Sequence, residues 1–362
     1  MSIISEDKKR VILGMSAGVD SSSAAVLLKK QGYDVIGVFM HFWKEPSQDV
    51  FRENKCCSIE SQQDARKIAR ILGIPLYTIN VAREFKKEVV NYFIRETKDG
   101  KTPNPCVVCN EKIKFNFLLK KMIEMRADYV ATGHYAEIKK IKGKYHLYIP
   151  SDKEKDQTYF LYSLTQKQLK HILFPVGKYK KSKIRKIAEK AGLPVFNKDD
   201  SQGICFISEK SPSDFIKRNI SLSPGDIVLT NGKKIGKHEG LELYTIGQRK
   251  GIKIGGTGPY YVIGRNFLKK QLIVTDKKSD LGINNKSMMV EIKNWIIPQT
   301  KFPLKISVKI RYRHPLVHGI IKKVKNNLYE IQFKQPQKAI TPGQSAVFYA
   351  KNKEVIGGGI II

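Results

Sequence analysis

The chain has 362 residues, of which 41% are hydrophobic and 27% are charged, which is typical of a globular protein with a sizeable core in two or three domains. No apolar run reaches the ~18 to 20 residues of a membrane helix, and the N-terminus lacks the layout of a secretory signal, so we expect a cytoplasmic protein. Sixty-six Lys and Arg against 33 Asp and Glu give a net charge of +33. This excess indicates a polyanionic partner, most commonly nucleic acid, with a lysine-rich composition bias as the alternative.

The first 135 residues alternate strand and helix patterns. Apolar runs rich in β-branched residues predict strands at 10–15, 34–42, 74–81 and 127–136. Apolar residues at helical spacing predict helices at 59–73, 85–97 and 112–125, and a further helix ends at Gly32. This alternation is typical of a doubly wound parallel sheet, whose ligands bind at the carboxyl ends of the strands. Gly14–Ser21, Met40 and Gly133–His134 fall there.

Beyond residue 150 the pattern changes twice. Residues 155–219 are mostly helical, with "KSKIRKIAEKAGLP" the clearest helix, and after Ser223-Pro-Gly short strands alternate with Asn-Gly, Lys-Asn-Asn and Pro-Gly turns. The predicted fold class is α/β, a doubly wound parallel sheet followed by two small antiparallel β-barrel domains. We place a catalytic domain with a helical extension at 1–212, a central β domain at 213–282 and a C-terminal β-barrel at 283–362.

The stretch "GMSAGVDSSSAA", Gly14–Ala25, joins the first strand directly to a helix. Small residues let backbone N–H groups approach an anion, and the helix N-terminus adds free donors and the positive end of its dipole. The spacing matches neither Gly-x-x-x-x-Gly-Lys-Ser/Thr nor Gly-x-Gly-x-x-Gly. Ser-x-Gly-x-Asp-Ser, from Ser16 to Ser21, resembles the pyrophosphate loop of the ATP-pyrophosphatase enzymes. A serine-rich helix cap with Asp20 in its first turn is the structural alternative.

Position 17 departs from that loop. The family pattern has Gly-Gly after the first serine, whereas Ala17 takes the first of these places in this chain. If the backbone there is left-handed, the added methyl group carries a conformational cost that bears on ATP use. If the backbone is helical or extended, Ala17 costs little.

The five cysteines indicate reduced thiols, because an odd number without a secretory signal argues for a reducing compartment. Cys106 and Cys109 form a Cys-x-x-Cys pair in a proline-rich loop before a helix, and Cys205 lies in a short strand-like run. Three types of site stay open: zinc, which lacks a second spaced pair; an iron–sulfur cluster on these three residues, which we do not favour; and thiol chemistry with a pKa lowered near a helix start. We expect Cys56 and Cys57 to be packing residues.

Nine motifs together carry a resemblance to one family, from about Lys9 to the C-terminus. In chain order they are "GMSAGVDSSSAA", "GVFMHFW", "TPNPCVVCNEKIKF", "ATGHYA", "KDQTYFLYSL", "DSQGICFI", "YTIGQRKG", "RYRHP" and "PGQSAVFY". The chain resembles the bacterial-type tRNA-specific 2-thiouridylases, whose first domain is of the ATP-pyrophosphatase type. The resemblance implies that ATP adenylates the C2 oxygen of the wobble uridine in certain tRNAs. Sulfur from a protein persulfide then displaces AMP.

The resemblance also implies the residues that do this chemistry. Cys205 matches the persulfide carrier, and Cys109 matches the nucleophile that releases sulfide by forming a disulfide with it or otherwise assists the transfer. Asp20 is the acid expected to be linked to the Mg²⁺ that accompanies ATP. The ATP-binding positions are Gly14, Met15, Ser16, Ala17, Gly18, Val19, Asp20, Ser21, Met40 and Gly133.

For tRNA, the resemblance implies contacts that suit the side chains concerned. Arg and Lys pair with phosphates, Tyr and His stack on unpaired bases, and Asn and Gln read base edges. The implied partners are the tRNAs for lysine, glutamate and glutamine, together with a persulfide donor, either a cysteine desulfurase or a relay protein. The implied tRNA-binding positions are Asn104, Pro105, Cys106, His134, Lys155, Asp156, Gln157, Arg311, Tyr312 and Gln344.

Two other function classes stay open. A different adenylating enzyme with the same loop, such as a lysidine-forming ligase or an amidotransferase-like synthetase, needs no pair of distant cysteines. A non-catalytic, basic RNA-binding protein would use the surface charge alone, with the loop silenced by Ala17.

Overall fold

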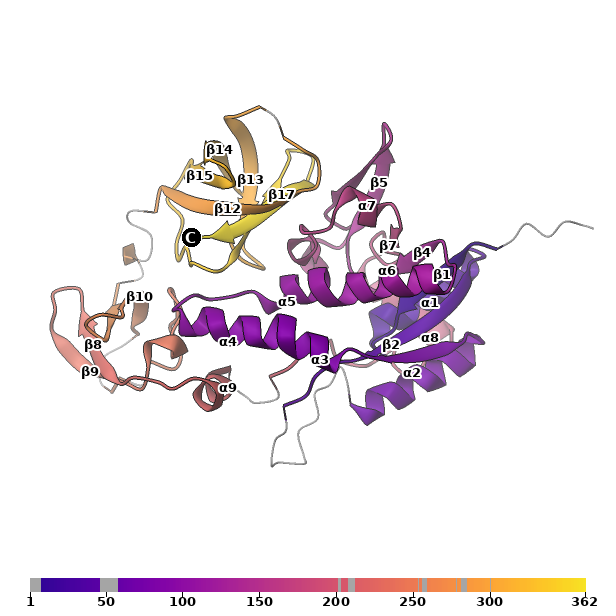
Figure 1. The fold of residues 1–362 in the computed structure, drawn as a ribbon, viewed down its shortest axis with the longest axis horizontal. Helices are drawn as coiled ribbons and strands as arrows, with labels where there is room; N and C mark the ends of the chain where they lie inside the picture. Colours follow the sequence, from indigo (N-terminus) through magenta and orange to yellow (C-terminus); the bar gives the residue numbers. More distant parts are fainter. Residues whose placement is uncertain are drawn as a thin grey trace, which may run out of the picture.

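The structure is a computed structural model that describes residues 8–45, 58–200, 203–207, 212–252, 254–255, 259–277, 279–280, 285–299 and 301–362. Three sheets organise these residues: a five-stranded parallel sheet, a four-stranded sheet and an eight-stranded sheet (Figure 1). Helices gather around the first sheet, while the other two consist of short strands with few helices (Figure 1).

The first sheet is parallel throughout, in the order β3-β2-β1-β4-β7. Its central strand is buried on both faces, which explains the unbroken apolar run Val11–Leu13 in the sequence. Chain order reverses beside β1, which pairs with β2 on one side and β4 on the other. The predicted doubly wound sheet is thereby confirmed. Its strands are β1 (Arg10–Gly14), β2 (Asp34–His41), β3 (Leu76–Asn80), β4 (Tyr129–Ala131) and β7 (Ile172–Leu173).

Helices cover both faces of this sheet. On one face α1, α2 and α8 pack against Val11 and Leu13, and on the other α3, α4, α6 and α9 pack around Ile12. The helices are α1 (Val19–Lys30), α2 (Ile59–Leu72), α3 (Ala82–Phe85), α4 (Asn91–Lys98), α5 (Pro105–Val108), α6 (Phe115–Glu124), α7 (Gln166–Leu169), α8 (Lys181–Lys190) and α9 (Pro212–Asn219). The described residues also form π-helical turns η1 (Lys86–Val90) and η2 (Cys109–Lys114) and 3₁₀ turns η3 (Lys153–Lys155), η4 (Thr158–Phe160) and η5 (Leu241–Leu243).

Local signals explain where the elements begin and end. Ser58 caps α2 by accepting a hydrogen bond from the Ser61 backbone N–H, and Gly73 ends that helix in the left-handed conformation. The predicted helices at 85–97 and 112–125 are confirmed, although π-helical turns interrupt both. The strand predicted at 127–136 is shorter, because β4 ends at Ala131 and the chain then turns toward the first turn of α1.

The central sheet has the order β10-β11-β8-β9. Its β8–β11 pair is parallel, so the described part of this sheet departs from the purely antiparallel pairing that we predicted. The parallel pair arises because the long connection between β9 and β10 carries the chain back across the sheet before β11. The strands are β8 (Gly225–Leu229), β9 (Lys234–His238), β10 (Tyr261–Asn266) and β11 (Gln271–Thr275).

The C-terminal strands close into a six-stranded antiparallel barrel, as predicted, because β12 pairs with both β15 and β17. A hairpin from the N-terminal part of the chain extends the same sheet by pairing β6 with β17. The sequence analysis did not predict this hairpin. The strands are β5 (Glu137–Ile141), β6 (Lys144–Tyr148), β12 (Ser287–Trp295), β13 (Leu304–Lys309), β14 (Val317–Lys325), β15 (Leu328–Phe333), β16 (Ser345–Tyr349) and β17 (Glu354–Ile361). Across the residues described, no helix combines the length and apolarity that crossing a membrane requires.

Candidate active site

The serine-rich loop lies at the carboxyl end of β1, beside the point where strand order reverses. Its shape depends on Ser21, whose Oγ accepts a hydrogen bond from the Ser16 N–H (3.2 Å) and donates one to the Gly18 carbonyl oxygen (3.2 Å). Gly18 is the N-cap residue of α1 and has no side chain with which to cap the helix. The first N–H groups of α1 therefore face a loop built of small residues, which is the arrangement that suits an anion.

Gly133 brings the end of β4 against this loop. A Cβ atom at position 133 would lie 2.6 Å from the backbone N of Ser21 and 2.7 Å from the backbone C of Asp20. Only glycine allows this approach, because the atoms in the way belong to the backbone of α1. Met40 lies near the carboxyl end of the neighbouring strand β2 and is buried. Gly14–Ser21, Met40 and Gly133 thus lie at the same edge of the sheet.

Ala17 adopts the left-handed conformation, with φ of 55°. For an L-residue this conformation costs about 1–2 kcal/mol. Of the two cases considered for Ala17, the left-handed one with a conformational cost is therefore correct. The residue is 0% exposed and belongs to the apolar cluster of β1, α1 and α8. Because its methyl group packs into the core, it does not occupy the space in front of the loop.

An ion-pair cluster surrounds Asp20. Lys181 Nζ lies 2.7 and 2.8 Å from the two carboxylate oxygens of Asp20 and 2.7 Å from Oδ1 of Asp200. Tyr135 donates a hydrogen bond to Asp20 (3.0 Å), and Lys155 binds Asp200 (2.8 Å). Burial alone would raise the pKa of Asp200, but the hydrogen bonds from Lys155 and Lys181 outweigh it and lower the pKa to about 2.

Three members of this cluster, Lys181, Tyr135 and Asp200, were not predicted from the sequence. Lys181 is one lysine among many, and nothing in its local pattern distinguishes it. Tyr135 lies inside the motif "ATGHYA", but its side chain received no role. Asp200 could have been noticed, because it belongs to an acidic pair in a basic chain and is the first residue of the motif "DSQGICFI" that carries Cys205.

Three of the five cysteines, Cys106, Cys109 and Cys205, lie among the residues that the structure describes. Cys109 is buried and is the first residue of the π-helical turn η2, a deviation that is frequent at functional sites. Cys205 is exposed. Burial raises the pKa of Cys106, against the lowering effect of Lys114. Cys56 and Cys57 lie outside the described residues.

One apolar cluster connects the cysteine-bearing elements with the sheet. Cys109 shares it with Met40 of β2 and with Phe206, the residue after Cys205. The Phe206 ring makes edge contacts with Phe85 and Phe93, which hold the 203–207 segment on the helical layer. The structure therefore places both cysteine segments around the same helices, with Cys109 inside and Cys205 at the surface.

The residues at 155–157 lie where the barrel docks. Asp156 is 4% exposed, and its carboxylate binds Lys309 Nζ of β13 (2.5 Å) and the hydroxyl of Thr158 (2.6 Å). Gln157 Oε1 accepts a hydrogen bond from the Tyr135 N–H (2.8 Å). Lys155 is bound to Asp200, as described above. These three side chains are thus held by other parts of the protein.

The two candidate tRNA-binding residues of the barrel lie beside this segment. The ring of Tyr312 packs on Phe160, with centroids 4.4 Å apart, and Arg311 is exposed. The structure therefore brings residues 155–157 and 311–312 together although they are far apart in the chain. Gln344 lies farther along the same interface, where its Nε2 donates to the Thr102 carbonyl oxygen (2.9 Å).

His134 and the proline-rich segment border the same region. His134 Nδ1 lies 2.8 Å from Thr132 Oγ1, and burial together with the charge of Lys114 lowers the pKa of His134 to about 3. The imidazole is therefore neutral at physiological pH. Asn104 is the N-cap residue of α5, and Pro105 is its buried first residue.

The next question is which of the described side chains could bind a metal ion at this site. Among the residues that the structure describes, no group of three or more His, Cys, Asp or Glu side chains is arranged to hold a metal ion. Asp20 supplies a single carboxylate at the loop, which matches the need of a magnesium ion that is carried mainly by phosphate oxygens.

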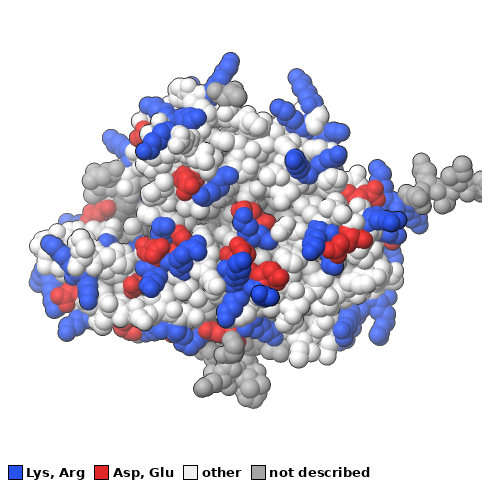
Figure 2. All heavy atoms as spheres, in the orientation of Figure 1, with Lys and Arg blue, Asp and Glu red and all other residues white. Residues whose placement is uncertain are grey.

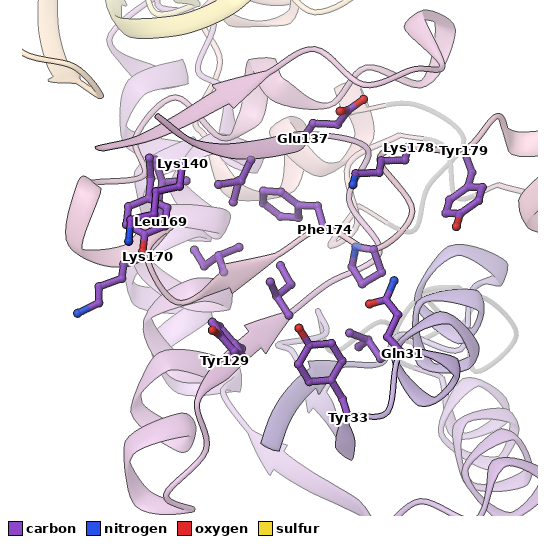
Figure 3. Close-up of a pocket in the computed structure, with 16 residues that line it drawn as sticks. Gln31, Tyr33, Tyr129, Glu137, Lys140, Leu169, Lys170, Phe174, Lys178 and Tyr179 are labelled. Carbon is purple, nitrogen blue, oxygen red and sulfur yellow. The ribbon is translucent and has the colours of Figure 1, made fainter. Parts of the chain in front are cut away.

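Two pockets lie apart from the Gly14–Ser21 loop. One of about 580 Å³ is lined by Tyr33, Tyr129, Phe174 and Lys178 (Figure 3) and lies at the amino ends of the strands, opposite the loop. The other, about 560 Å³, lies between the segment before α5, α9 and residues 239–251, and Gln344 of the barrel contributes to its wall. It therefore adjoins the segments that lead to both cysteine motifs.

Basic residues outnumber acidic residues by 66 to 33 in the chain. On the face seen in Figure 2, Lys and Arg project from the barrel, from the central sheet and from the parallel-sheet part, while acidic side chains are interspersed mainly across the middle. Such a distribution suits a large polyanion better than one localised anionic group.

Comparison with known proteins accounts for essentially the whole chain. The family model described as "tRNA methyl transferase HUP domain" matches residues 9–209, "tRNA methyl transferase PRC-barrel domain" matches 213–276, and "Aminomethyltransferase beta-barrel domain" matches 285–361.

Curated relatives match over nearly their full lengths. The tRNA-specific 2-thiouridylase MnmA 1 of Clostridium botulinum is 44% identical over 357 residues, covering 98% of this chain and 99% of the relative. The MnmA of Halothermothrix orenii is 44% identical, covering 97% and 98%, and MnmA 2 of Thermoanaerobacter sp. (strain X514) is 45% identical, covering 98% of each. The chain therefore belongs to the family of tRNA-specific 2-thiouridylases.

Proposed function

We propose that this protein thiolates C2 of the wobble uridine in the tRNAs for lysine, glutamate and glutamine. ATP activates the uridine by adenylation, and a persulfide on Cys205 supplies the sulfur. The observation that carries the proposal is the shared cluster in which Met40 of the nucleotide edge, Cys109 and Phe206 pack together. This cluster links the anion-binding edge of the sheet to both cysteine-bearing segments.

In the first step the C2 oxygen of uridine attacks the α-phosphorus of ATP. The new P–O bond forms as the bond to the β-phosphate bridging oxygen breaks, and pyrophosphate leaves with the electron pair. The residues of Gly14–Ser21 bind the phosphates through backbone N–H groups and serine hydroxyls. The N3 proton of the uridine passes to solvent, and C2 now carries AMP as a good leaving group.

A magnesium ion fits this loop as a companion of the nucleotide, with Asp20 as the protein carboxylate beside it. When bound, it supplies charge neutralisation at the phosphate oxygens. Asp20 would hold the ion, and the Ser16 and Ser21 hydroxyls would bind the phosphate oxygens beside it.

Sulfur transfer uses the two cysteines in turn. The Cys109 thiolate attacks the inner sulfur of the Cys205 persulfide, a Cys109–Cys205 disulfide forms, and the outer sulfur leaves as sulfide. The sulfane sulfur gains the two electrons that the cysteines lose. Sulfide then attacks C2 of the adenylated uridine and AMP departs. A thiol reductant restores both cysteines, and a cysteine desulfurase or relay protein reloads Cys205.

Cys205 is exposed and Cys109 is buried, so the transfer requires the 203–207 segment to move inward. The exposed position suits loading by a protein donor, because the thiol can be reached from outside. The buried position protects the adenylated uridine from water. Both states belong to one catalytic cycle.

For tRNA, the exposed Arg311 supplies a phosphate contact, and the neutral His134 and Asn104 face the extruded base. A base in the anticodon loop must leave its stack to reach Cys109, as in other enzymes that act on nucleobases. Asp156 and Gln157 support this surface by fixing the segment between the barrel and Tyr135.

The test is a thiolation assay with purified protein, unmodified tRNA, ATP, Mg²⁺ and a persulfide donor, read by retardation in a mercury gel. We expect a retarded band that Cys205→Ser and Cys109→Ser abolish, while both variants still convert ATP to AMP and pyrophosphate when tRNA is present. The absence of a retarded band with every lysine, glutamate and glutamine tRNA would contradict the proposal.

The same assay separates the alternatives. An adenylating enzyme of another kind keeps full activity in both serine variants, and a non-catalytic RNA-binding protein produces no tRNA-dependent AMP. Methylation, the activity in two of the matching family descriptions, leaves RNA mobility in the mercury gel unchanged.

A further inference from the structure

Lys181 occupies an unusual position for a lysine. It is the first residue of α8, its side chain is 11% exposed, and its ammonium group lies between Asp20 in the first turn of α1 and Asp200. The Lys181 backbone N–H is tied to Asp152 Oδ2 (2.8 Å), which fixes the start of α8. Lys181 thus stands at the anion-binding end of α1, about 160 residues away in the chain.

The charges of the cluster around this lysine balance. Three cations, Lys155, Lys181 and Arg185, lie beside three carboxylates, Asp20, Asp152 and Asp200. Partly buried charge is costly unless it is paired, so Lys181 needs a replacement anion whenever Asp20 releases it. The adjoining loop of small residues and the helix N-terminus provide the space and the N–H donors for one.

Lys181 can serve such an anion without rearrangement of the backbone. Its four-carbon stem is flexible, so the ammonium can turn from the Asp20 carboxylate to a phosphate while α8 stays in place. The ion pair between Asp200 and Lys181 persists during this exchange, because Lys155 and Arg185 keep Asp200 itself in position.

We propose that Lys181 binds the pyrophosphate part of ATP and that Asp200 is the positioning residue that holds it there. The inference rests on the proposed function, in which pyrophosphate leaves with the electron pair of the broken bond and so gains negative charge. A cation that contacts the β- and γ-phosphates stabilises this charge as the α–β bridge breaks. AMP lacks those phosphates and does not reach Lys181.

The experiment compares nucleotide affinities of the free protein by calorimetry, with ATP, AMP and inorganic pyrophosphate as the probes. Lys181→Met keeps the length of the side chain and removes its charge. We expect ATP and pyrophosphate to bind about 10- to 100-fold more weakly to this variant, as for loss of a charged hydrogen bond, and AMP affinity to change less than threefold. Lys181→Arg keeps the charge and recovers part of the ATP affinity.

Lys186→Met is the matched control, because Lys186 is exposed on the same helix. It should bind all three probes like the wild type. Should Lys181→Met fail to fold, the double variant Lys181→Met, Asp200→Asn removes a cation together with a carboxylate and is tested in the same way. Asp200→Asn alone should weaken ATP binding less than Lys181→Met does. It should also lower the affinity for ATP relative to the affinity for AMP.

A structural role predicts a different result. If Lys181 only joins α8 to α1, the folded variants bind ATP and AMP with the wild-type affinity ratio, and that result overturns the inference. Failure of the proposed function is a separate outcome: a protein that binds ATP through Lys181 but produces no thiolated tRNA contradicts the function and leaves the phosphate contact intact.

Discussion

Substituting Ala17 with glycine tests whether the loop is strained. Ala17 has φ of 55° and is 0% exposed in the cluster formed by β1, α1 and α8. Alanine rarely adopts this conformation, whereas glycine adopts it without penalty. Ala17→Gly therefore introduces the residue that the backbone geometry at this position favours.

Two opposing effects determine the size of the change. Relief of the left-handed conformation should stabilise the protein by about 1–2 kcal/mol. Loss of a buried methyl group should destabilise it by about 0.8 kcal/mol. The net expectation is therefore a slight stabilisation, between about 0 and 1 kcal/mol, or a melting temperature raised by up to about 4 °C for a unit of 150–250 residues.

Ala24→Gly supplies the matched control. Ala24 is also 0% exposed and belongs to the same cluster, but it lies inside α1. Its substitution deletes the same methyl group and adds the cost of glycine in a helix interior, about 1 kcal/mol, for a total loss of about 2 kcal/mol. The two variants should therefore differ by about 2 kcal/mol or more in urea-induced unfolding followed by circular dichroism.

The comparison also bears on the loop's activity. Because the Ala17 methyl group points into the core, Ala17→Gly should leave ATP affinity within about threefold of the wild type, equivalent to less than 1 kcal/mol. If Ala17→Gly destabilises the protein as much as Ala24→Gly does, the strain argument is wrong. If it increases ATP affinity more than tenfold, the methyl group does obstruct the nucleotide.

Four further predictions concern the site. Gly133→Ala should weaken ATP binding and lower the melting temperature, because its Cβ would collide with the backbone of α1, and overpacking of this kind costs about 1–3 kcal/mol; nucleotide titration and thermal unfolding measure the two effects. His134, with a pKa near 3, should show no titration of its imidazole NMR signals between pH 5 and 8, and a midpoint near 6.5 would refute its burial. Asp200, with a pKa lowered from 3.8 to about 2, stabilises the folded state fully above pH 4, so the difference in unfolding free energy between wild type and Asp200→Asn should shrink as the pH falls from 4 toward 2. The logarithm of tRNA affinity should fall linearly with the logarithm of salt concentration, and an affinity insensitive to salt in filter binding would argue against phosphate contacts.

Features built from neighbouring residues were predictable from the sequence. The loop from Ser16 to Ser21 was recognisable because its small residues, its serines and its acid all lie within one turn between a strand and a helix. The parallel sheet followed from the alternation of apolar runs and helical spacing, and the barrel followed from short strands with turn residues between them. In each case the physical cause lies within a window of a few residues.

Features that depend on docking were not predictable in the same way. Lys181 reaches Asp20 only because α8 packs against α1, and no local periodicity records that contact. The β5–β6 hairpin joins the barrel through pairs such as Val355 with Leu147, more than 200 residues apart. The left-handed backbone at Ala17 was likewise open, since alanine by itself favours helical or extended conformations.

Docking of the barrel also changes how the candidate tRNA-binding residues should be interpreted. Asp156 is held by Lys309 of β13, and Gln344 binds the Thr102 carbonyl oxygen just before Asn104. Substitution of either residue would therefore disturb the position of the barrel as well as any contact with RNA. Arg311 is exposed, so its substitution reports on phosphate contact more directly. Lys309 and Arg311 are near neighbours in the chain, and only the first of them is held by residues 155–157. Comparing Arg311→Ala with Lys309→Ala should therefore separate a loss of RNA affinity from a displacement of the barrel.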